Sequence, residues 1–598
     1  MSNRFITEFP IEVETLNAEA VPYDNTSSGL VSTDVQGAID ELKADSLGVT
    51  AQYVLDHLDG TLATYKSLMR YWFIANGANV ATSAGLTALC DKWYELVRPE
   101  WDGGTRFAEP SVDGTSTSSF GTKVGDNEGM VFNPSSDTVH GESDYEGNPL
   151  FIPTDVNVVL DETTREPIIT GIDGITANFT RYDPSIFVGV MQMSGFIAQT
   201  QESDTYTVWY SSTQGRHEGS EPLAQAVRWS DNTVRPWVVH SKYVSQTIDG
   251  KLTSFSGALP TSYSISHNTL QTLSAATGTG YSGMCYCDQA FLYLMNVILT
   301  GSLTADGTMM QGCLNANWQY PALVSETGVK RILVTTAQGA NFKVGMQVLL
   351  GNYAGNIDRG QTAMYSITGD TGAKITAINT VTLDGTDYSA ITVDVDAAFD
   401  TVANGTATTG TTYISSFGWA TGANDNILGF CGNAGGNTSG IYPSTIQGIE
   451  YSAGKYEDVG DTILCLYKDT DDAYWYEPYV CKNRSNQSTS ITANYVTSGL
   501  KLAQQSTAGW KYIKKLSYAM GIFFATIVGG SASTYTRDSI NESANATGAC
   551  GALLFGGLSS GVGYGGLSAV AGDSALSRAR WAIASRLSFN GNRGEFAA

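Results

Sequence analysis

The sequence predicts a mainly β protein with some α structure: short N-terminal helices, then a large β-rich part that carries a small inserted all-β module. Glycine is abundant, with 65 of 598 residues, and only 15% of the residues are charged, where about 25% is ordinary. Short apolar runs such as "NVVL", "SIFVGVMQM" and "TYTVWY" are bounded by Gly, Asp and Ser clusters, which is typical of strands and turns. At one domain per about 100 to 200 residues, the length allows roughly three to five domains.

The net charge and the apolar runs exclude some classes of partner. The chain carries 33 Lys and Arg against 58 Asp and Glu, a formal charge of −25. Because a polyanion is bound through clustered cations, we expect no nucleic acid partner. The start, "MSNRFITEFP", lacks the apolar core of a secretory signal, so we expect a protein made and kept in the host cytoplasm or released by lysis. "AFLYLMNVIL" and "GIFFATIV" are shorter than the roughly 20 residues that span a bilayer, so we expect no membrane insertion.

The cysteines and the acidic residues form no metal motif. The eight cysteines are too widely spread for a disulfide scaffold, and most are expected to be buried thiols. Cys285 and Cys287 are one residue apart, and the next, Cys313, gives no zinc-ligand spacing. The stretch "KDTDDAYW" at 468–475 lacks the glycine and the distal glutamate of a calcium loop. We expect a solvated β-turn there and no cofactor, with a weak calcium site as the open alternative.

Residues 1–100 are expected to form a helical region for attachment and oligomerisation. The turn in "AVPYDNTSSGLVSTDVQGAIDELK" leads into a helix that Thr33 or Ser32 caps. A second apolar series has steps of 3, 4, 3, 4 and 3 residues, as in a heptad seam: Leu55, Leu58, Leu62, Tyr65, Met69 and Trp72. Two interpretations stay open: a short coiled coil that joins two or three copies, or an amphipathic helix packed on its own domain and broken at Asp59-Gly60.

Composition divides the remaining chain. Residues 101–179 are interpreted as a linker and a β-rich connecting region, because "DGGTRFAEPSVDGTSTSSFGTKVGDNEG" shows little periodicity. A helix is predicted at 285–299, where Cys287, Phe291, Leu294 and Ile298 fall on one face. Residues 328–414 hold short β runs and a hairpin at "LDG". We interpret them as a small β module inserted between two parts of a larger domain, 180–327 and 415–598.

Two enzyme motifs occur, and neither has the context that it needs. "GTGYSG" at 278–283 matches G-x-G-x-x-G, but "NTLQTLSAAT" before it is too polar for the buried strand of a dinucleotide site. "GLSSG" at 557–561 matches the nucleophile elbow of serine hydrolases, which requires a later histidine, and all five histidines precede Ser559. Asp and Glu are too abundant for one sequence to show a catalytic pair for glycoside cleavage. We therefore expect no enzyme.

Aromatic and small polar residues are mixed in several stretches, among them "WYSSTQGRHEGSEPLAQAVRWSDNTVRPWVVH" and "DAYWYEPYV". Rigid Tyr and Trp beside adaptable Ser, Gly and Asn are typical of binding surfaces. We expect a minority of these aromatic residues to be exposed and most of the tryptophans to lie in the core: Trp209, Trp229, Trp237 and Trp475.

Two stretches resemble known families. "VPYDNTSSGLVSTDVQGAIDEL" at 21–42 resembles a segment near the N-termini of bacteriophage tail-fibre and other virion structural proteins. Much of 180–590, including "GMCYCDQAFLYLMNV" and "GALLFGGLSSGVGYGGLSAVAGDSALSRARWAIASRLSF", is similar to phage adhesins with a C-terminal C-type-lectin-like domain, a branch related to the formylglycine-generating-enzyme fold and to phage tropism determinants. The resemblance implies a C-type-lectin-like α+β domain in which "ALLFGG" and "WAIASRLSF" are core strands. It does not imply the copper chemistry of the generating enzyme, because the single Cys550 near the end gives no cysteine pair.

The same resemblance implies which residues touch a host receptor. In that family the loops between the core strands carry the contacts, and here these loops are rich in Gly, Ser and Ala. The implied contact residues are Tyr535, Arg537, Asp538, Asn541, Ser559, Ser560, Tyr564, Asp573, Ser574 and Arg578.

These expectations describe a bacteriophage virion fibre protein, on the tail or the capsid surface, that binds a host-surface glycan or protein. The N-terminal region would join other virion structural proteins and build a homo-oligomer, by resemblance a trimer, whose copies gain avidity. Two alternatives stay open. One is a capsid head-fibre or decoration protein with a mainly structural role. The other is a virion-associated polysaccharide depolymerase with an acidic pair in a cleft.

Overall fold

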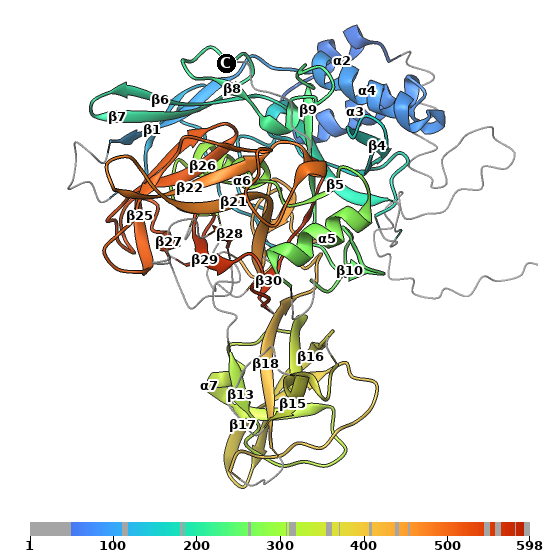
Figure 1. Cartoon of the computed structure of the whole chain (residues 1–598). Helices are drawn as coiled ribbons and strands as arrows, with labels where there is room; N and C mark the ends of the chain where they lie inside the picture. Colours follow the sequence, from blue (N-terminus) through green and yellow to red (C-terminus); the bar gives the residue numbers. More distant parts are fainter. Residues whose placement is uncertain are drawn as a thin grey trace, which may run out of the picture.

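The computed structural model describes residues 49–109, 118–179, 183, 186–260, 265–305, 308–309, 318–353, 362–369, 371–405, 410–436, 442–451, 455–542, 550–556, 564–580 and 582–590. The fold is mainly β with few helices, as predicted. A large body holds most of the elements, and a smaller module of strands projects from it (Figure 1). The helix expected after Thr33 or Ser32 lies outside the described residues.

Three helices open the described chain: α2 (Ala51–His57), α3 (Leu62–Ala75) and α4 (Ser83–Leu96). A threonine precedes each helix, and its hydroxyl accepts a hydrogen bond from a backbone N–H of the first turn. Between α2 and α3, Gly60 has a φ of 77°, and the carboxylate of Asp59 accepts hydrogen bonds from Thr61 and Thr64. The apolar series is therefore broken at Asp59-Gly60, as one of the two interpretations predicted.

The apolar face of α3 packs inside its own chain. Tyr65, Met69 and Trp72 are buried, and the rings of Tyr65 and Trp72 lie 5.5 and 5.6 Å from the ring of Trp93 in α4. Trp93 also donates a hydrogen bond from Nε1 to the hydroxyl of Tyr65, at 3.0 Å. The interpretation of this series as an intermolecular coiled-coil seam is therefore wrong for α3, because α4 of the same chain covers the seam residues.

A five-stranded sheet includes part of the stretch expected as a linker. Its order is β2-β1-β7-β6-β8, with the bounds Asp102–Ala108 (β1), Thr122–Gly125 (β2), Phe196–Ser203 (β6), Tyr206–Ser212 (β7) and Glu221–Pro222 (β8). A Cβ on Gly103 would meet the ring of Trp101, and a Cβ on Gly104 would meet Tyr210. The linker prediction is wrong for this stretch, because the glycines of β1 permit close packing rather than flexibility.

A second sheet contains apolar runs that were predicted as strands. Its order is β4-β3-β5-β9, with the bounds Thr154–Leu160 (β3), Pro167–Ile172 (β4), Phe187–Met193 (β5) and Trp237–Ser241 (β9). Every residue of β5 is buried, which explains why this run is apolar on both faces apart from Gln192. Because β3 pairs with β5, the segment 101–179 shares a sheet with the segment that follows it.

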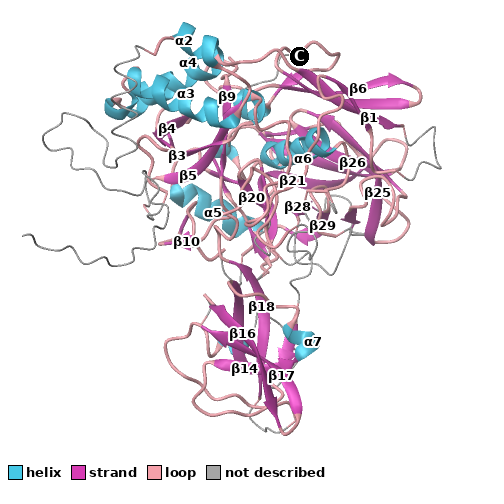
Figure 2. Ribbon diagram, turned by 180° about the vertical axis from the view of Figure 1, so that it is seen from behind, coloured by secondary structure: helices cyan, strands magenta, loops and turns pink. Residues whose placement is uncertain are grey.

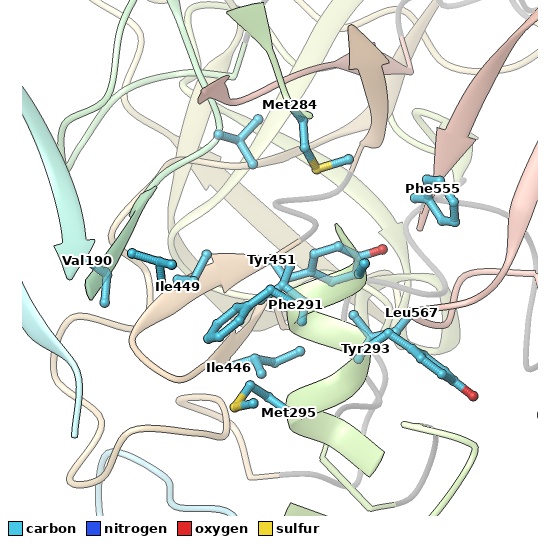
Figure 3. Close-up of a cluster of buried hydrophobic side chains, with 14 of the residues drawn as sticks. Val190, Met284, Phe291, Tyr293, Met295, Ile446, Ile449, Tyr451, Phe555 and Leu567 are labelled. Carbon is cyan, nitrogen blue, oxygen red and sulfur yellow. The ribbon is translucent and has the colours of Figure 1, made fainter. Parts of the chain in front are cut away.

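Helix α6 (Tyr286–Thr300) runs through the core of the body. The helix predicted at 285–299 is confirmed, but all of its residues except Thr300 are buried, so it is covered on every side rather than on one face. Figure 3 shows Phe291, Tyr293 and Met295 of this helix beside Ile446 and Tyr451. The latter two come from a hairpin of β19 (Ser444–Ile446) and β20 (Ile449–Tyr451).

Polar side chains complete the C-terminal end of α6. Nζ of Lys123 donates to the carbonyl oxygen of Leu299 at 2.7 Å, and Nδ2 of Asn127 donates to that of Ile298 at 3.0 Å. The hydroxyl of Tyr145 donates to the same Ile298 oxygen at 3.1 Å. These bonds satisfy carbonyls that a helix end leaves unpaired, and a cation at this end also suits the helix dipole.

The C-terminal part of the chain builds a ten-stranded sheet with the main order β23-β22-β21-β28-β29-β27-β25-β26, while β24 pairs with β22 and β30 with β21. The bounds are Tyr456–Lys468 (β21), Tyr474–Cys481 (β22), Tyr495–Thr497 (β23), Leu502–Ala503 (β24), Gly509–Ala519 (β25), Ile522–Val528 (β26), Ser539–Glu542 (β27), Cys550–Phe555 (β28), Val570–Ala575 (β29) and Ile583–Ala584 (β30). The acidic stretch at 468–475 is the turn between β21 and β22. Its Asp469 accepts hydrogen bonds from the backbone of Asp471 and Ala473 and from Nε1 of Trp475.

Short elements close the body. Helix α5 (His267–Thr277) leads into "GTGYSG", so that motif follows a helix and not the strand that a dinucleotide site requires. Two pairs of short strands remain. β10 (Thr247–Ile248) pairs with β11 (Lys251–Leu252), and β12 (Ser282–Gly283) pairs with β31 (Leu587–Ser588). The single 3-10 turns of the body are η2 (Ala78–Val80), η3 (Pro149–Phe151), η4 (Ala224–Ala226) and η6 (Arg484–Asn486), and η5 (Thr362–Tyr365) lies in the inserted module.

The inserted module has a sheet of its own, ordered β13-β18-β15-β16-β17-β14. Its elements are Gln319–Pro321 (β13), Arg331–Thr335 (β14), Thr336–Gly339 (α7), Met346–Tyr353 (β15), Ala373–Leu383 (β16), Thr386–Val393 (β17) and Thr411–Trp419 (β18). The hairpin predicted at "LDG" joins β16 to β17 through Asp384 and Gly385, which both have positive φ, as a tight hairpin turn requires. Figures 1 and 2 both show the module on the side of the body away from α2, α3 and α4.

The C-terminal runs are buried strands, as the resemblance implied. Within "ALLFGG", the residues of β28 from Ala552 to Phe555 are buried, and so are β30 and β31 within "WAIASRLSF". β31 pairs with β12, and β30 pairs in parallel with β21. Segments on both sides of the inserted module therefore build one body.

Candidate functional site

Tyr564, one of the predicted contact residues, lies against two aromatic residues of β25. Its ring is 5.0 Å from Trp510, edge on, and 6.3 Å from Tyr512. Trp510 and Tyr512 are two positions apart in the strand and so share a face, and β27 places Asn541 directly opposite Trp510. All four side chains are half-buried. We call Trp510, Tyr512, Asn541 and Tyr564 the aromatic surface.

The aromatic surface combines ring faces with hydrogen-bonding groups. Burial, followed by a hydrogen bond with Tyr564, raises the pKa of Tyr512, so its hydroxyl stays protonated at neutral pH. Rigid rings provide contact area at low entropic cost, and amide and hydroxyl groups give the contact its direction. This chemistry suits the apolar faces and the hydroxyl groups of a sugar. The sequence-based site lacked Trp510 and Tyr512, although their alternation in "GWKYIKKLSY" is the pattern of one strand face.

A second group of predicted contact residues lines a cavity of about 390 Å³. Arg578 is exposed there, and Asp573 is half-buried with its carboxylate 3.9 Å from the guanidinium of Arg580. Ser574 also lines the cavity, but only 1% of it is exposed. Its assignment as a direct contact is wrong, because it is an interior position of β29, paired with Ala552 of β28.

Three further predicted contact residues are buried or bonded to another segment of the chain. Asp538 is 1% exposed, and its Oδ2 accepts hydrogen bonds from the backbone and the hydroxyl of Ser568, at 3.0 and 2.7 Å. Tyr535 is 5% exposed, and Arg537 donates from Nε to Ser119 at 3.1 Å. Their assignment as receptor contacts is wrong for Tyr535 and Asp538, which are buried, and Arg537 is engaged with a distant segment. Two other predicted contacts, Ser559 and Ser560, lie outside the described residues.

A cavity of about 660 Å³ was not predicted from the sequence. It lies between α3, the start of β3 and the β19–β20 hairpin. Four charged residues on its wall form what we call the charged cluster: Asp155, Lys242, Asp425 and Glu450. Nζ of Lys242 lies 2.6 Å from Oδ2 of Asp155 and 3.7 Å from Oδ1 of Asp425. No local motif could reveal this cluster, because long stretches of chain separate most of its members.

Glu450 has the most unusual environment in the charged cluster. It is 2% exposed; its Oε2 accepts a hydrogen bond from the backbone of Gly422 at 2.9 Å, while Oε1 has no hydrogen-bond partner among the described residues. Burial, and after it the nearby carboxylate of Asp425, raise the pKa of Glu450 to about 8. Glu450 is therefore mostly protonated at neutral pH and can donate a hydrogen bond, whereas Asp425 accepts bonds from Tyr243 and Ser256.

A serine, a histidine and an aspartate also meet in the core, but not as a catalytic triad. Asp288 accepts a hydrogen bond from the hydroxyl of Ser588 at 2.7 Å and lies 3.0 Å from Nδ1 of His240. All three are buried, and the serine hydroxyl bonds to the carboxylate rather than to the imidazole. In a triad the imidazole must accept the serine proton, so this cluster is part of the core packing.

The burial and the pairing of the cysteines agree only in part with what the sequence predicted. Of the seven cysteines that the structure describes, five are buried, as expected, and Cys465 and Cys550 are partly exposed. The statement that Cys550 gives no cysteine pair is wrong, because the antiparallel pairing of β21 with β28 brings its Sγ to 2.9 Å from that of Cys465. Within the described part of the chain, no three or more His, Cys, Asp or Glu side chains converge as metal ligands would.

None of the helices in the described ranges is both long enough and apolar enough to cross a bilayer. Compared with models of protein families and with curated protein sequences, the chain matches none.

Proposed function

We propose that the protein is a bacteriophage virion fibre protein that binds a glycan on the surface of its bacterial host through the aromatic surface. The resemblance of residues 21–42 to tail-fibre proteins and of 180–590 to lectin-like phage adhesins supports the virion assignment. The observation that carries the binding site is the contact of Tyr564 with Trp510 and Tyr512 on a half-exposed strand face.

The surroundings of the aromatic surface favour an extended contact. β25, β27, β29 and β28 are neighbours in one sheet, so the cavity lined by Asp573 and Arg578 belongs to the same sheet as Trp510. Charged groups and aromatic rings on one sheet offer a sugar chain both hydrogen bonding and stacking. In a homo-oligomeric fibre, several weak sites of this kind would act together, because tethering raises the effective concentration of each further site.

Binding of the full chain to host cells and to an array of bacterial surface polysaccharides tests this proposal. We expect binding by the unmodified protein and a clear loss for Trp510→Ala and Tyr564→Ala. Tyr206→Ala is the matched control, because Tyr206 is a 43% exposed aromatic residue on β7 in another sheet. Equal binding by all variants would reject the aromatic surface, and no binding at all by the unmodified protein would favour the alternative of a structural head-fibre or decoration protein.

A second candidate function, cleavage of a surface polysaccharide, is favoured by the charged cluster. Glycoside cleavage needs a carboxyl group that is protonated at neutral pH and a second carboxyl group near it. Glu450 meets the first requirement, and Asp425 is near enough to raise its pKa. The test is release of reducing ends from host polysaccharide by the unmodified protein and by Glu450→Gln. Release that the variant abolishes would establish this activity, and absence of release by the unmodified protein would exclude it.

A further inference from the structure

Cys465 and Cys550 face each other across two neighbouring strands. They are directly opposite in the antiparallel pairing of β21 and β28, and their Sγ atoms lie 2.9 Å apart. Directly opposite residues of antiparallel strands have Cα atoms about 4.5 to 5.5 Å apart, within the roughly 4.4 to 6.8 Å over which a disulfide closes. The backbone therefore already has the spacing of a cross-strand disulfide, and only the side chains need to move.

Access distinguishes this pair from the other cysteines that the structure describes. Cys90, Cys285, Cys287, Cys431 and Cys481 are buried, so a dissolved oxidant does not reach them in the folded protein. Cys465 and Cys550 are partly exposed, and Cys550 lines the cavity of about 390 Å³ together with Arg578. This cavity lets a small thiol reagent approach the Cys550 sulfur.

The two thiols also differ in reactivity. The hydrogen bond between the two thiols lowers the pKa of Cys550, whereas the same bond, followed by burial, raises the pKa of Cys465. Cys550 lines the cavity, whereas Cys465 is not among the residues that line it. Since the thiolate is the nucleophile in thiol–disulfide exchange and a reagent in the cavity meets Cys550, Cys550 is the residue that reacts first. Cys465 is then the resolving cysteine, within reach of the sulfur that Cys550 presents.

We propose that Cys465 and Cys550 are a modification site that closes into a disulfide when the protein passes from a reducing cytoplasm to surroundings that contain an oxidised disulfide such as oxidised glutathione. The Cys550 thiolate attacks one glutathione sulfur, forms a mixed disulfide and releases one glutathione thiolate. Cys465 then loses its proton and attacks Sγ of Cys550, which releases the second glutathione. One disulfide bond forms and one breaks, so the two cysteines are oxidised and glutathione is reduced.

The consequence is a covalent link between two strands in the middle of the largest sheet. β21 and β28 are central neighbours in the ten-stranded order, and the chain between the two cysteines includes β22 to β27. A disulfide that closes a loop of this length restricts the unfolded chain more than the folded one, which stabilises the fold. The reduced protein can thus be assembled in the cytoplasm and be stabilised after release.

The experiment uses the full chain, purified with a reducing agent and then exposed to oxidised glutathione. Remaining thiols are blocked with N-ethylmaleimide in denaturant, and the unreduced digest is examined by mass spectrometry. We expect a peptide pair joined through Cys465 and Cys550, an unchanged Cys90 thiol as internal control, and a melting temperature about 5 °C or more above that of the reduced protein.

Two variants assign the order of reaction. Cys465→Ser is expected to keep glutathione bound to Cys550 and to show no rise in melting temperature, whereas Cys550→Ser is expected to take up little glutathione. If either variant fails to fold, the digest of the unmodified protein alone decides. Both cysteines found blocked by N-ethylmaleimide after oxidation, or glutathione retained on Cys550 of the unmodified protein without the joined peptide, would overturn the proposal. Neither outcome depends on glycan binding, which is measured separately.

Discussion

Arg586 and Glu457 form a buried bidentate ion pair. Nε of Arg586 lies 2.6 Å from Oε2 of Glu457, Nη2 lies 2.7 Å from Oε1, and each residue is at most 1% exposed. Arg586 also donates to the backbone oxygens of Ser241 at 3.1 Å and of Glu450 at 2.6 Å. One side chain near the end of the described chain therefore connects β9, β20 and β21.

Replacing Arg586 is expected to destabilise the body strongly. Arg586→Met leaves the Glu457 carboxylate buried without its cation, and breaking a buried pair in this way costs about 3–5 kcal/mol. Urea unfolding measures the loss. The double variant Arg586→Met, Glu457→Met removes both charges and is expected to recover part of the stability; a loss below about 1 kcal/mol for the single variant would contradict the role of the pair.

Lys123 is expected to stabilise the end of α6. Lys123→Met removes its hydrogen bonds to Met130, Tyr145 and Leu299 and takes away the side-chain donor to the Leu299 carbonyl at the end of the helix, at a cost of about 2 kcal/mol. Lys251→Met, at an exposed position of β11, is the control and should change the unfolding free energy by no more than about 0.5 kcal/mol. Similar effects of the two substitutions would argue against this cap.

The pKa of Glu450 predicts a dependence of stability on pH. Its value in the folded protein is about 8, against roughly 4.3 in an unfolded chain. Between these values the folded state holds a proton that the unfolded chain releases. The stabilising contribution is therefore complete below about pH 4.3 and is lost as the pH rises through 8. Unfolding free energies at several pH values should show Glu450→Gln becoming more stable relative to the unmodified protein as pH rises, and parallel curves would contradict the assignment.

Within the aromatic surface, ring contact is expected to matter more than the hydroxyl of Tyr564. Tyr564→Phe keeps the ring next to Trp510 and should change glycan affinity by less than about tenfold, whereas Trp510→Ala should weaken it by about 10- to 100-fold, or roughly 1–3 kcal/mol. Titration calorimetry with fragments of a bound polysaccharide measures both. A larger loss for Tyr564→Phe than for Trp510→Ala would show that hydrogen bonding dominates.

The inserted module is expected to be dispensable for folding of the body. Its strands pair only with one another among the described elements, and its ends meet, because the backbone N–H of Ser416 donates to the carbonyl of Trp318 at 3.0 Å. Residues 319–415 can be replaced with a short Gly-Ser linker. The melting temperature of the body should then stay within a few degrees of that of the full chain, because the linker spans the same short distance and its closure costs little entropy. Loss of soluble folded protein would show that the module supports the body.

Much of the local structure could be predicted because short-range patterns determine it. The apolar runs bounded by turn residues form β3, β5 and β7, and "LDG" forms the hairpin turn between β16 and β17, as predicted. Asp59-Gly60 ended a helix because glycine takes positive φ without strain. Strand β1, which contains two glycines, was not predicted. Gly103 and Gly104 are needed because aromatic rings pack closely against them, and a sequence pattern does not show where those rings lie.

The sequence could place residues near the candidate site, but it could not show which of them are exposed. The sequence by itself determined the mainly β class and the presence of aromatic residues near the chain end, because composition and periodicity are local properties. The buried C-terminal strands were implied by the resemblance to lectin-like adhesins. Only the tertiary structure decided that Tyr564 meets Trp510, that Asp538 and Ser574 are interior, and that Cys465 faces Cys550. Burial and pairing depend on partners from distant segments, and those partners are brought together by sheet register rather than by sequence distance.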